Sequence, residues 1–145
     1  MAGTTTGQQV FDLAMGLMDN ISSAGLSDTS DNTEYKNRTL RILNALRLEL
    51  YPLSDTCAAA ISGTRPVSSV LTALSDTIDL DDYLAQTVLP YGLSAHLLID
   101  ENPNAASFYQ QRYEEMKGGA AKLPSEFKAI TDVYGGNRYN KFSRW

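Results

Sequence analysis

Four aspartates lie close together near the middle of the chain: Asp76, Asp79, Asp81 and Asp82. Carboxylate oxygens are the ligands that calcium and magnesium prefer, so this cluster is a candidate metal site. The calcium loop of EF-hand proteins also needs a glycine and a closing glutamate at fixed offsets, and both are missing here. Acidic residues stabilise the first turn of a helix through its dipole. The sequence therefore favours a structural role at a helix start over a metal site.

His96 and Cys57 are the only histidine and the only cysteine. His96 could act as a general base, but no G-x-S-x-G nucleophile pattern stands near it, and spatial partners stay open. A reactive thiol needs neighbours that stabilise the thiolate, so we interpret Cys57 as inert and His96 as a packing or interface residue. The two residues are too few for a zinc site of cysteines and histidines. A lone cysteine cannot form an internal disulfide, which is typical of a reducing compartment such as a bacterial cytoplasm.

Glu114 and Glu115 are the remaining paired acids. Adjacent residues of a helix point in different directions, so this pair is not a ready-made acid–base dyad and is better explained as a solvated face. Neither a P-loop nor a Rossmann glycine pattern is present. The sequence thus predicts no catalytic, cofactor-binding or metal-binding residues, and we expect a protein that is not an enzyme.

The end of the chain alternates aromatic and basic groups. The residues are Tyr134, Arg138, Tyr139, Phe142 and Trp145. Aromatic residues and arginine dominate binding energy at protein interfaces, so this segment is a candidate docking arm. Stacking on single-stranded nucleic acid and a frayed terminus are the alternatives. The only tryptophan of the chain lies in this arm, which favours docking to a protein partner.

Charge is also distributed unevenly along the chain. Residues 1–116 carry six Lys and Arg against fifteen Asp and Glu, a net charge of −9, whereas residues 117–145 carry six against two, a net charge of +4. Non-specific DNA binding needs clustered basic groups, so the acidic body argues against it. The basic end of the chain is expected to dock on something negative or amphiphilic.

Apolar periodicity predicts four helices that would position these residues. The first carries an apolar stripe from Val10 to Ile21, with a capping box at Thr6 and Gln9 and a stop at Gly25. The second runs from about Glu34 to Leu50, after an N-cap at Asp31. Its outer surface is expected to carry Arg38, Arg41 and Arg47.

The third predicted helix starts near Asp79 as its N-cap, and Pro90 should kink or break it. Gly92 and Ala95 are small enough to allow close packing of helices. The fourth starts at Asn102-Pro103 and ends at Gly118-Gly119. Its apolar side would consist of Ala105, Phe108, Tyr109, Tyr113 and Met116, and a short helix over 125–133 follows.

These elements predict a mainly α, four-helix bundle-like single domain with an irregular loop at about 53–78 and an extended C-terminal arm. Residues 1–133 form the helical domain and residues 134–145 the arm. The loop could hold short extended pieces, a β-hairpin or a binding loop. No stretch reaches the ~20 apolar residues of a membrane span, and Met1 to Gln9 lacks a secretion signal, so no membrane is expected.

Three stretches resemble a known family. They are VFDLAMGLMD (10–19), EYKNRTLRILNALRLELYP (34–52) and IDLDDYLAQTVLPYGLSAHLLIDENPNAASFYQQRYEEM (78–116). Together they look like the small adaptor (connector) proteins of the head–tail module of tailed bacteriophages and prophages. The resemblance covers roughly residues 8–118, and LPYGLSAHLL followed by DENPNAASFYQQRYEEM is its most specific part. The shared pattern consists of helix faces and contains no catalytic signature.

The resemblance implies a helical protein that assembles as a ring, a dodecamer, beneath the portal protein in the virion. Such adaptors dock on the portal by a C-terminal extension, which here would be Tyr134 to Trp145. They present a surface to the next neck or tail component, and packaged DNA passes through the lumen without sequence-specific binding. The expected location is the head–tail junction, with assembly in the host bacterial cytoplasm. An acidic body fits a DNA conduit because it repels DNA.

Other interpretations stay open at this point. A head-completion or tail-terminator protein is one, although such proteins are often richer in β-structure. A small DNA-binding regulator is another. It would use the basic end of the chain or the second helix, which holds Lys36, Arg38, Arg41 and Arg47. An enzyme is the least favoured interpretation.

Overall fold

The computed structural model describes residues 3–57 and 63–120, and nearly all of its regular structure is helical. The elements are α1 (Gly7–Leu17), η1 (Ser30–Asn32), α2 (Thr33–Leu50), η2 (Tyr51–Leu53), η3 (Leu84–Val88), α3 (Leu89–Leu98) and α4 (Pro103–Gly119). Thr6 and Thr77 form an isolated antiparallel β-bridge, and the described ranges contain no named strand. The mainly α class predicted from the sequence is therefore confirmed.

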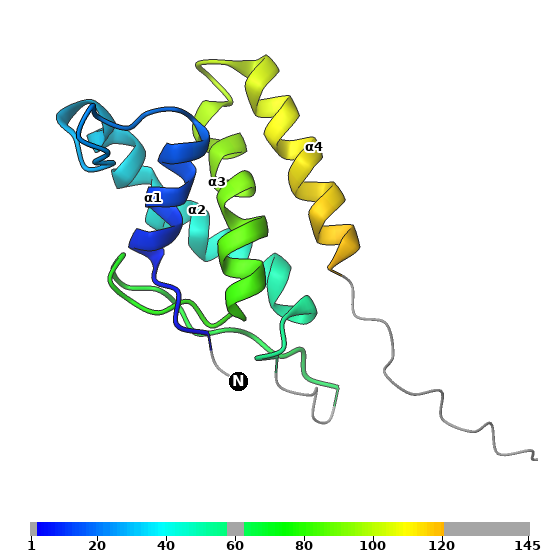
Figure 1. Cartoon of the computed structure of the whole chain (residues 1–145). Helices are drawn as coiled ribbons and strands as arrows, with labels where there is room; N and C mark the ends of the chain where they lie inside the picture. Colours follow the sequence, from blue (N-terminus) through cyan, green and yellow to red (C-terminus); the bar gives the residue numbers. More distant parts are fainter. Residues whose placement is uncertain (1–2, 58–62, 121–145) are drawn as a thin grey trace, which may run out of the picture.

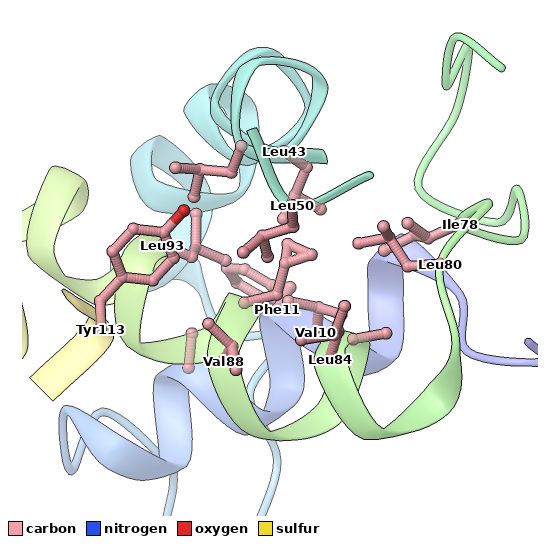
Figure 2. Close-up of a cluster of buried hydrophobic side chains, with 14 of the residues drawn as sticks. Val10, Phe11, Leu43, Leu50, Ile78, Leu80, Leu84, Val88, Leu93 and Tyr113 are labelled. Carbon is pink, nitrogen blue, oxygen red and sulfur yellow. The ribbon is translucent and has the colours of Figure 1, made fainter. Parts of the chain in front are cut away.

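Helix α3 lies at the centre of the domain and contacts α1, α2 and α4 (Figure 1). Its sequence LPYGLSAHLL is apolar on nearly every side, which is typical of a buried helix. Figure 2 shows the core around it, with Val10 and Phe11 from α1, Leu43 and Leu50 from α2, and Tyr113 from α4. The arrangement is three helices around a central one, and a regular four-helix bundle stays a prediction.

The start of α1 is as predicted, but its end is not. The Thr6 hydroxyl accepts a hydrogen bond from the Gln9 amide at 3.3 Å, and the Gln9 side chain accepts one from the Thr6 amide at 2.9 Å. The helix stops at Leu17 because Asp19 adopts a left-handed conformation with φ 57°. The expected continuation to Ile21 and the stop at Gly25 are therefore wrong.

Helix α2 begins one residue earlier than predicted, and its N-cap is different. Asp31 lies inside the 3₁₀ turn η1 and caps nothing, so that prediction is wrong. Asn32 occupies the N-cap position, but its side-chain amide donates to the carbonyls of Asn20 and Ser27 at 2.6 and 2.8 Å. This side chain therefore fastens the preceding loop instead of capping the helix. The helix ends at Leu50, before Pro52, as expected.

Arg47 is only 3% exposed, which contradicts its expected place on the outer surface of α2. Its guanidinium donates to the Ser68 carbonyl at 2.7 Å and to the Ser68 hydroxyl, and Nε donates to Asn44 at 2.9 Å. Asn44 also bonds both the amide and the carbonyl of Leu71, each at 2.9 Å. Burying a charged group is costly unless it is hydrogen-bonded, and Nε and Nη1 of this guanidinium have acceptors. The part of the irregular loop around Ser68 and Leu71 is thus fixed to α2.

The helix before α3 starts at Asp81, not at the expected Asp79. The Asp81 carboxylate accepts a hydrogen bond from the Leu84 amide at 3.0 Å, which is the geometry of an N-cap. A π-helical turn, η3, follows, in which the Leu89 amide donates to the Leu84 carbonyl. Pro90 has no N–H and its ring crowds the preceding turn, so a wider turn fits it. The helical backbone continues through Pro90, so the expected break is not found, and the π-helical turn before it is the irregularity that the structure shows.

Gly92 allows the close packing that the sequence suggested. A Cβ added at Gly92 would lie 2.9 Å from two ring atoms of Tyr113 and 3.0 Å from a methyl group of Leu46. α2 and α4 thus approach α3 at the same point. α4 starts as predicted, because Asn102 accepts a hydrogen bond from the Ala105 amide at 3.1 Å. Phe108, expected on the apolar side of α4, is instead exposed.

The predicted short helix over 125–133 lies outside the described residues. The boundary between a helical domain and an arm at residue 134 lies there as well. Across residues 3–57 and 63–120, no helix is long and apolar enough to cross a membrane.

Candidate functional site

Asp76 does not face its neighbouring aspartates as a metal ligand would. Its Oδ2 accepts hydrogen bonds from the Thr72 amide at 2.7 Å, the Thr72 hydroxyl at 2.8 Å and the Ala73 amide at 2.9 Å. These bonds, the one from Ala73 first, lower the pKa of Asp76 below its ordinary value. The carboxylate therefore closes its own turn in the loop.

Asp82 accepts hydrogen bonds from the segment that precedes α1. Its Oδ1 accepts from the amides of Thr4 and Thr5 at 2.7 and 3.0 Å and from the Thr5 hydroxyl at 2.7 Å. The bond from the Thr5 side chain is the main reason why the pKa of Asp82 lies below its ordinary value. Asp81, besides capping, accepts from the Asp55 amide at 3.1 Å.

The aspartates thus fasten separate pieces of backbone and do not converge on one point. In the part of the chain that the structure describes, no three His, Cys, Asp or Glu side chains are placed to hold a metal ion. This geometry favours the structural explanation of the acidic cluster.

His96 lies on the exposed side of α3, beside an open groove that also contains Glu49 and Ser107. A histidine, a serine and an acid in one groove are the residue types of a hydrolytic triad. Their bonds do not form one. The Ser107 hydroxyl donates to the Pro103 carbonyl at 2.9 Å, and Glu49 forms an ion pair with Lys117. Ser107 and Glu49 are therefore bound to groups other than His96.

Glu114 and Glu115 bind different partners on the outside of α4. Glu114 forms an ion pair with Lys117 at 3.1 Å, and Glu115 forms one with Arg112 at 3.4 Å. Both glutamates are exposed, as the sequence predicted for a solvated face. Cys57 is half-buried just after η2.

The basic residues of α2 do not form a nucleic-acid-binding stripe. Arg47 is buried against Ser68, and Arg38 donates to the Leu97 carbonyl at 3.2 Å. Lys36 forms an ion pair with Asp28 at 2.6 Å. Arg41 is exposed. A recognition helix needs its basic side chains free for phosphates and bases, and most of those on α2 are already bound.

An apolar groove that the sequence did not reveal lies where α1, α3 and α4 meet. It has a volume of about 520 Å³. We define the apolar groove by its lining residues Asp12, Leu13, Gly16, Leu17, Gln86, Thr87, Pro90, Tyr91 and Met116. Sequence periodicity placed Leu13, Leu17 and Tyr91 in the core stripes. The packed helices leave these side chains at the edge of the core, where no sequence signal distinguishes them.

Aromatic rings extend the apolar groove along α4. The Tyr91 and Tyr109 ring centroids are 6.2 Å apart, and the exposed Phe108 ring meets Tyr109 edge-on at 5.5 Å. The Tyr109 hydroxyl donates to the Leu17 carbonyl at 2.7 Å, so it satisfies a carbonyl at the end of α1. The result is a continuous apolar surface of the kind that proteins use for binding.

A second exposed apolar feature is the segment 65–70, which we call the valine segment. Val67 and Val70 are 66% and 67% exposed, while Ser68 between them is buried against Arg47. Arg65 is exposed at its beginning. The sequence showed only an irregular loop here, because the buried side of the segment is polar.

The predicted docking residues Tyr134, Arg138, Tyr139, Phe142 and Trp145 lie outside the described residues. Comparison of the chain with protein-family models, with curated proteins and with solved structures finds no match.

Proposed function

We propose that this chain is a structural virion protein, an adaptor whose copies form a ring between the portal and the tail or neck of a tailed phage. The ring would contain twelve copies, as the resemblance of residues 8–118 to head–tail adaptors implies. The portal protein, the next neck or tail component and the packaged DNA are its partners. The protein belongs at the head–tail junction and assembles in the host cytoplasm, and its role is assembly, not catalysis.

One observation carries the proposal: several charged side chains of the helical domain bind groups within it, whereas a run of basic and aromatic groups lies at the end of the chain. Asp76, Asp81 and Asp82 bind backbone amides, and Arg47 binds Ser68. The exposed apolar surface of the domain and the arm Tyr134 to Trp145 are therefore the main candidates for partner contacts. Such a distribution suits a protein that builds an assembly.

In this proposal the arm inserts into the portal and anchors each copy. Ordering a segment on binding costs conformational entropy, so a single arm binds weakly. Many arms acting on one portal ring raise the overall affinity through effective concentration. The acidic domain then surrounds the DNA path and repels the phosphates instead of trapping them.

The test is co-sedimentation with purified portal rings from the same genome. The full chain and a chain cut after Gly136 are compared at equal concentration. We expect the full chain to pellet with the portal and the shortened chain to stay in the supernatant. If both pellet, the arm is not the anchor; if neither pellets, portal docking is wrong.

Point variants of the full chain sharpen this test. Trp145→Ala should weaken portal binding by about tenfold or more, because a buried aromatic anchor contributes on that scale. Asn140→Ala, in the same arm but without an aromatic or basic group, is the matched control and should bind as wild type. Equal losses for both variants would contradict the assigned anchor residues.

A further inference from the structure

The valine segment is held so that its two apolar side chains must face outward. Arg47 binds the carbonyl and hydroxyl of Ser68, and Asn44 binds both backbone groups of Leu71. These bonds fix the backbone on each side of Val70. Ser68 is the residue of the segment that packs against α2. The segment cannot turn Val67 or Val70 inward without breaking bonds to a buried guanidinium, which is costly. It therefore presents a fixed apolar projection to solvent.

The apolar groove is the matching concave surface of the same domain. Leu13 is 42% exposed in it, and Pro90 and Met116 contribute to its walls. A volume of about 520 Å³ is in the range of pockets that accept several apolar groups, about 300–1,000 Å³. The valine segment lies against α2, whereas the groove is built by α1, α3 and α4. The two surfaces are therefore built by different elements of the domain.

We infer that the valine segment of one copy of this chain docks in the apolar groove of the next copy. This inference rests on the proposed ring, for which it supplies the contact between subunits. Charge supports the second copy as the occupant. Asp12 is the one charged residue that lines the groove, and Arg65 begins the valine segment. Asp12 accepts hydrogen bonds from the side chains of Gln8 and Ser27 through Oδ1, but neither Asp12 nor Arg65 belongs to an ion pair among the described residues. The two opposite charges can therefore still attract each other across an interface.

A contact between two different surfaces is heterologous, and repeating it produces a closed ring or an open filament. Two valines and their neighbours bury far less than the ~800 Å² per partner of a stable interface. A single contact is therefore weak, and free chains should associate only at high concentration. Closure of a ring, or prior docking of arms on a portal, makes the contacts act together.

Sedimentation velocity of the full chain over a series of concentrations, from about micromolar to about millimolar, measures this association. The double variant Val67→Asp/Val70→Asp and the variant Leu13→Asp should each weaken self-association by about tenfold or more, because each introduces an unpaired carboxylate at an apolar contact. The matched controls are Ile99→Asp and Ile21→Asp, which replace apolar residues of similar exposure, 58% and 46%, that belong neither to the groove lining nor to the valine segment. The controls should associate as wild type. All variants are checked for an unchanged helical circular dichroism spectrum.

Mixing the two defective variants tests the geometry directly. The Val67→Asp/Val70→Asp chain keeps an intact groove, and the Leu13→Asp chain keeps an intact valine segment. Together they can form one contact and no second one, so the mixture should give a 1:1 dimer that does not grow. A contact between like surfaces would not be restored by mixing, and a mixture that stays monomeric would overturn the inference.

A charge exchange provides an independent readout. Asp12→Arg and Arg65→Asp should each weaken association, because each places like charges at the contact. The double variant Asp12→Arg/Arg65→Asp restores opposite charges and should recover association to near the wild-type level. If the double variant is as weak as or weaker than the single ones, the two residues do not meet.

The outcomes separate this inference from the proposed function. If wild type associates but none of the groove and segment variants changes that association, the inference is wrong and the ring stands. If the segment variants lose portal binding while self-association is intact, the occupant is the portal and the inference fails. If wild type stays monomeric at every concentration and binds portal rings without cooperativity, the contact and the ring are both wrong, while portal docking stands.

Discussion

Several charged side chains of this domain connect segments of backbone through hydrogen bonds. Asp82 joins the segment before α1 to the start of the π-helical turn, and Asp76 closes a turn in the loop. Arg47, which is positively charged, also binds backbone, because it donates to the carbonyl of Ser68. Burial lowers the pKa of the Arg47 guanidinium. The negative charge of Asp79 acts in the opposite direction and raises it. Arginine remains protonated in proteins, so the bonds to Ser68 persist.

Asp82 should make stability depend on pH in the acid range. Its pKa is lower in the folded state than the ordinary 3.8, so the unfolded chain takes up the proton first as the pH falls. The stabilisation is present above about pH 4 and is lost as the pH falls through the folded-state pKa. We expect Asp82→Asn to lower the melting temperature at pH 7 and to flatten its decrease between about pH 5 and pH 2. Thermal unfolding followed by circular dichroism measures this.

Asp31→Asn is the control, because Asp31 is exposed in η1 and caps no helix. It should leave both the melting temperature at pH 7 and its acid dependence close to wild type. An Asp82→Asn chain with the acid dependence of wild type would mean that the bonds to Thr4 and Thr5 do not stabilise the fold.

The central element is α3, whose packing depends on one glycine. Tyr113 of α4 and Leu46 of α2 occupy the space where a side chain of residue 92 would begin. Close packing of three helices at this point excludes any larger residue. The glycine was visible in the sequence, but its two neighbours come from segments far away along the chain.

Gly92→Ala and Gly16→Ala should change stability in opposite directions. Alanine is favoured over glycine within a helix by about 1 kcal/mol. At Gly16 of α1 an added Cβ meets nothing within 4 Å, so Gly16→Ala should stabilise the fold by about 0.5–1 kcal/mol. At Gly92 overpacking costs about 1–3 kcal/mol and exceeds that gain, for a net loss of about 1 kcal/mol. Urea unfolding at equilibrium compares the two, and a stabilising Gly92→Ala would contradict the packing.

At the scale of the whole molecule, charge and secondary structure bear on the alternative functions. The described part of the chain carries seven Lys and Arg against fifteen Asp and Glu, a net charge of −8. It contains no strand, whereas tail-terminator and head-completion proteins were expected to be richer in β-structure. A DNA-binding regulator would need free basic groups, and three of the four on α2 already bind groups within the domain.

The full chain should not bind duplex DNA measurably at about 150 mM salt, because the acidic domain repels phosphates within the Debye length of about 8 Å. Filter binding of the full chain and of the chain cut after Gly136 measures this at several salt concentrations. Retention that falls steeply with salt and disappears in the shortened chain would instead support nucleic-acid binding by the basic end.

The sequence by itself determined that four helices form, and it predicted the N-cap of two of them. Thr6 with Gln9 and Asn102 with Pro103 define helix starts through bonds within four residues, and such local bonds can be read from spacing. Pro90 indicated an irregularity in the third helix, and the structure has a π-helical turn directly before it. The sequence also predicted that Glu114 and Glu115 face solvent.

Only the tertiary structure decided where polar residues and surfaces lie. From the sequence, Asp79 and Asp31 were as plausible N-cap residues as Asp81 and Asn32, which occupy those positions. Arg47 was expected on the surface, but it binds Ser68, 21 positions away. The apolar groove and the valine segment depend on which parts of each apolar stripe the neighbouring helices cover. Contacts between segments distant in sequence decide which apolar side chains are covered. Helical periodicity depends only on residues close in sequence, so it cannot predict those contacts.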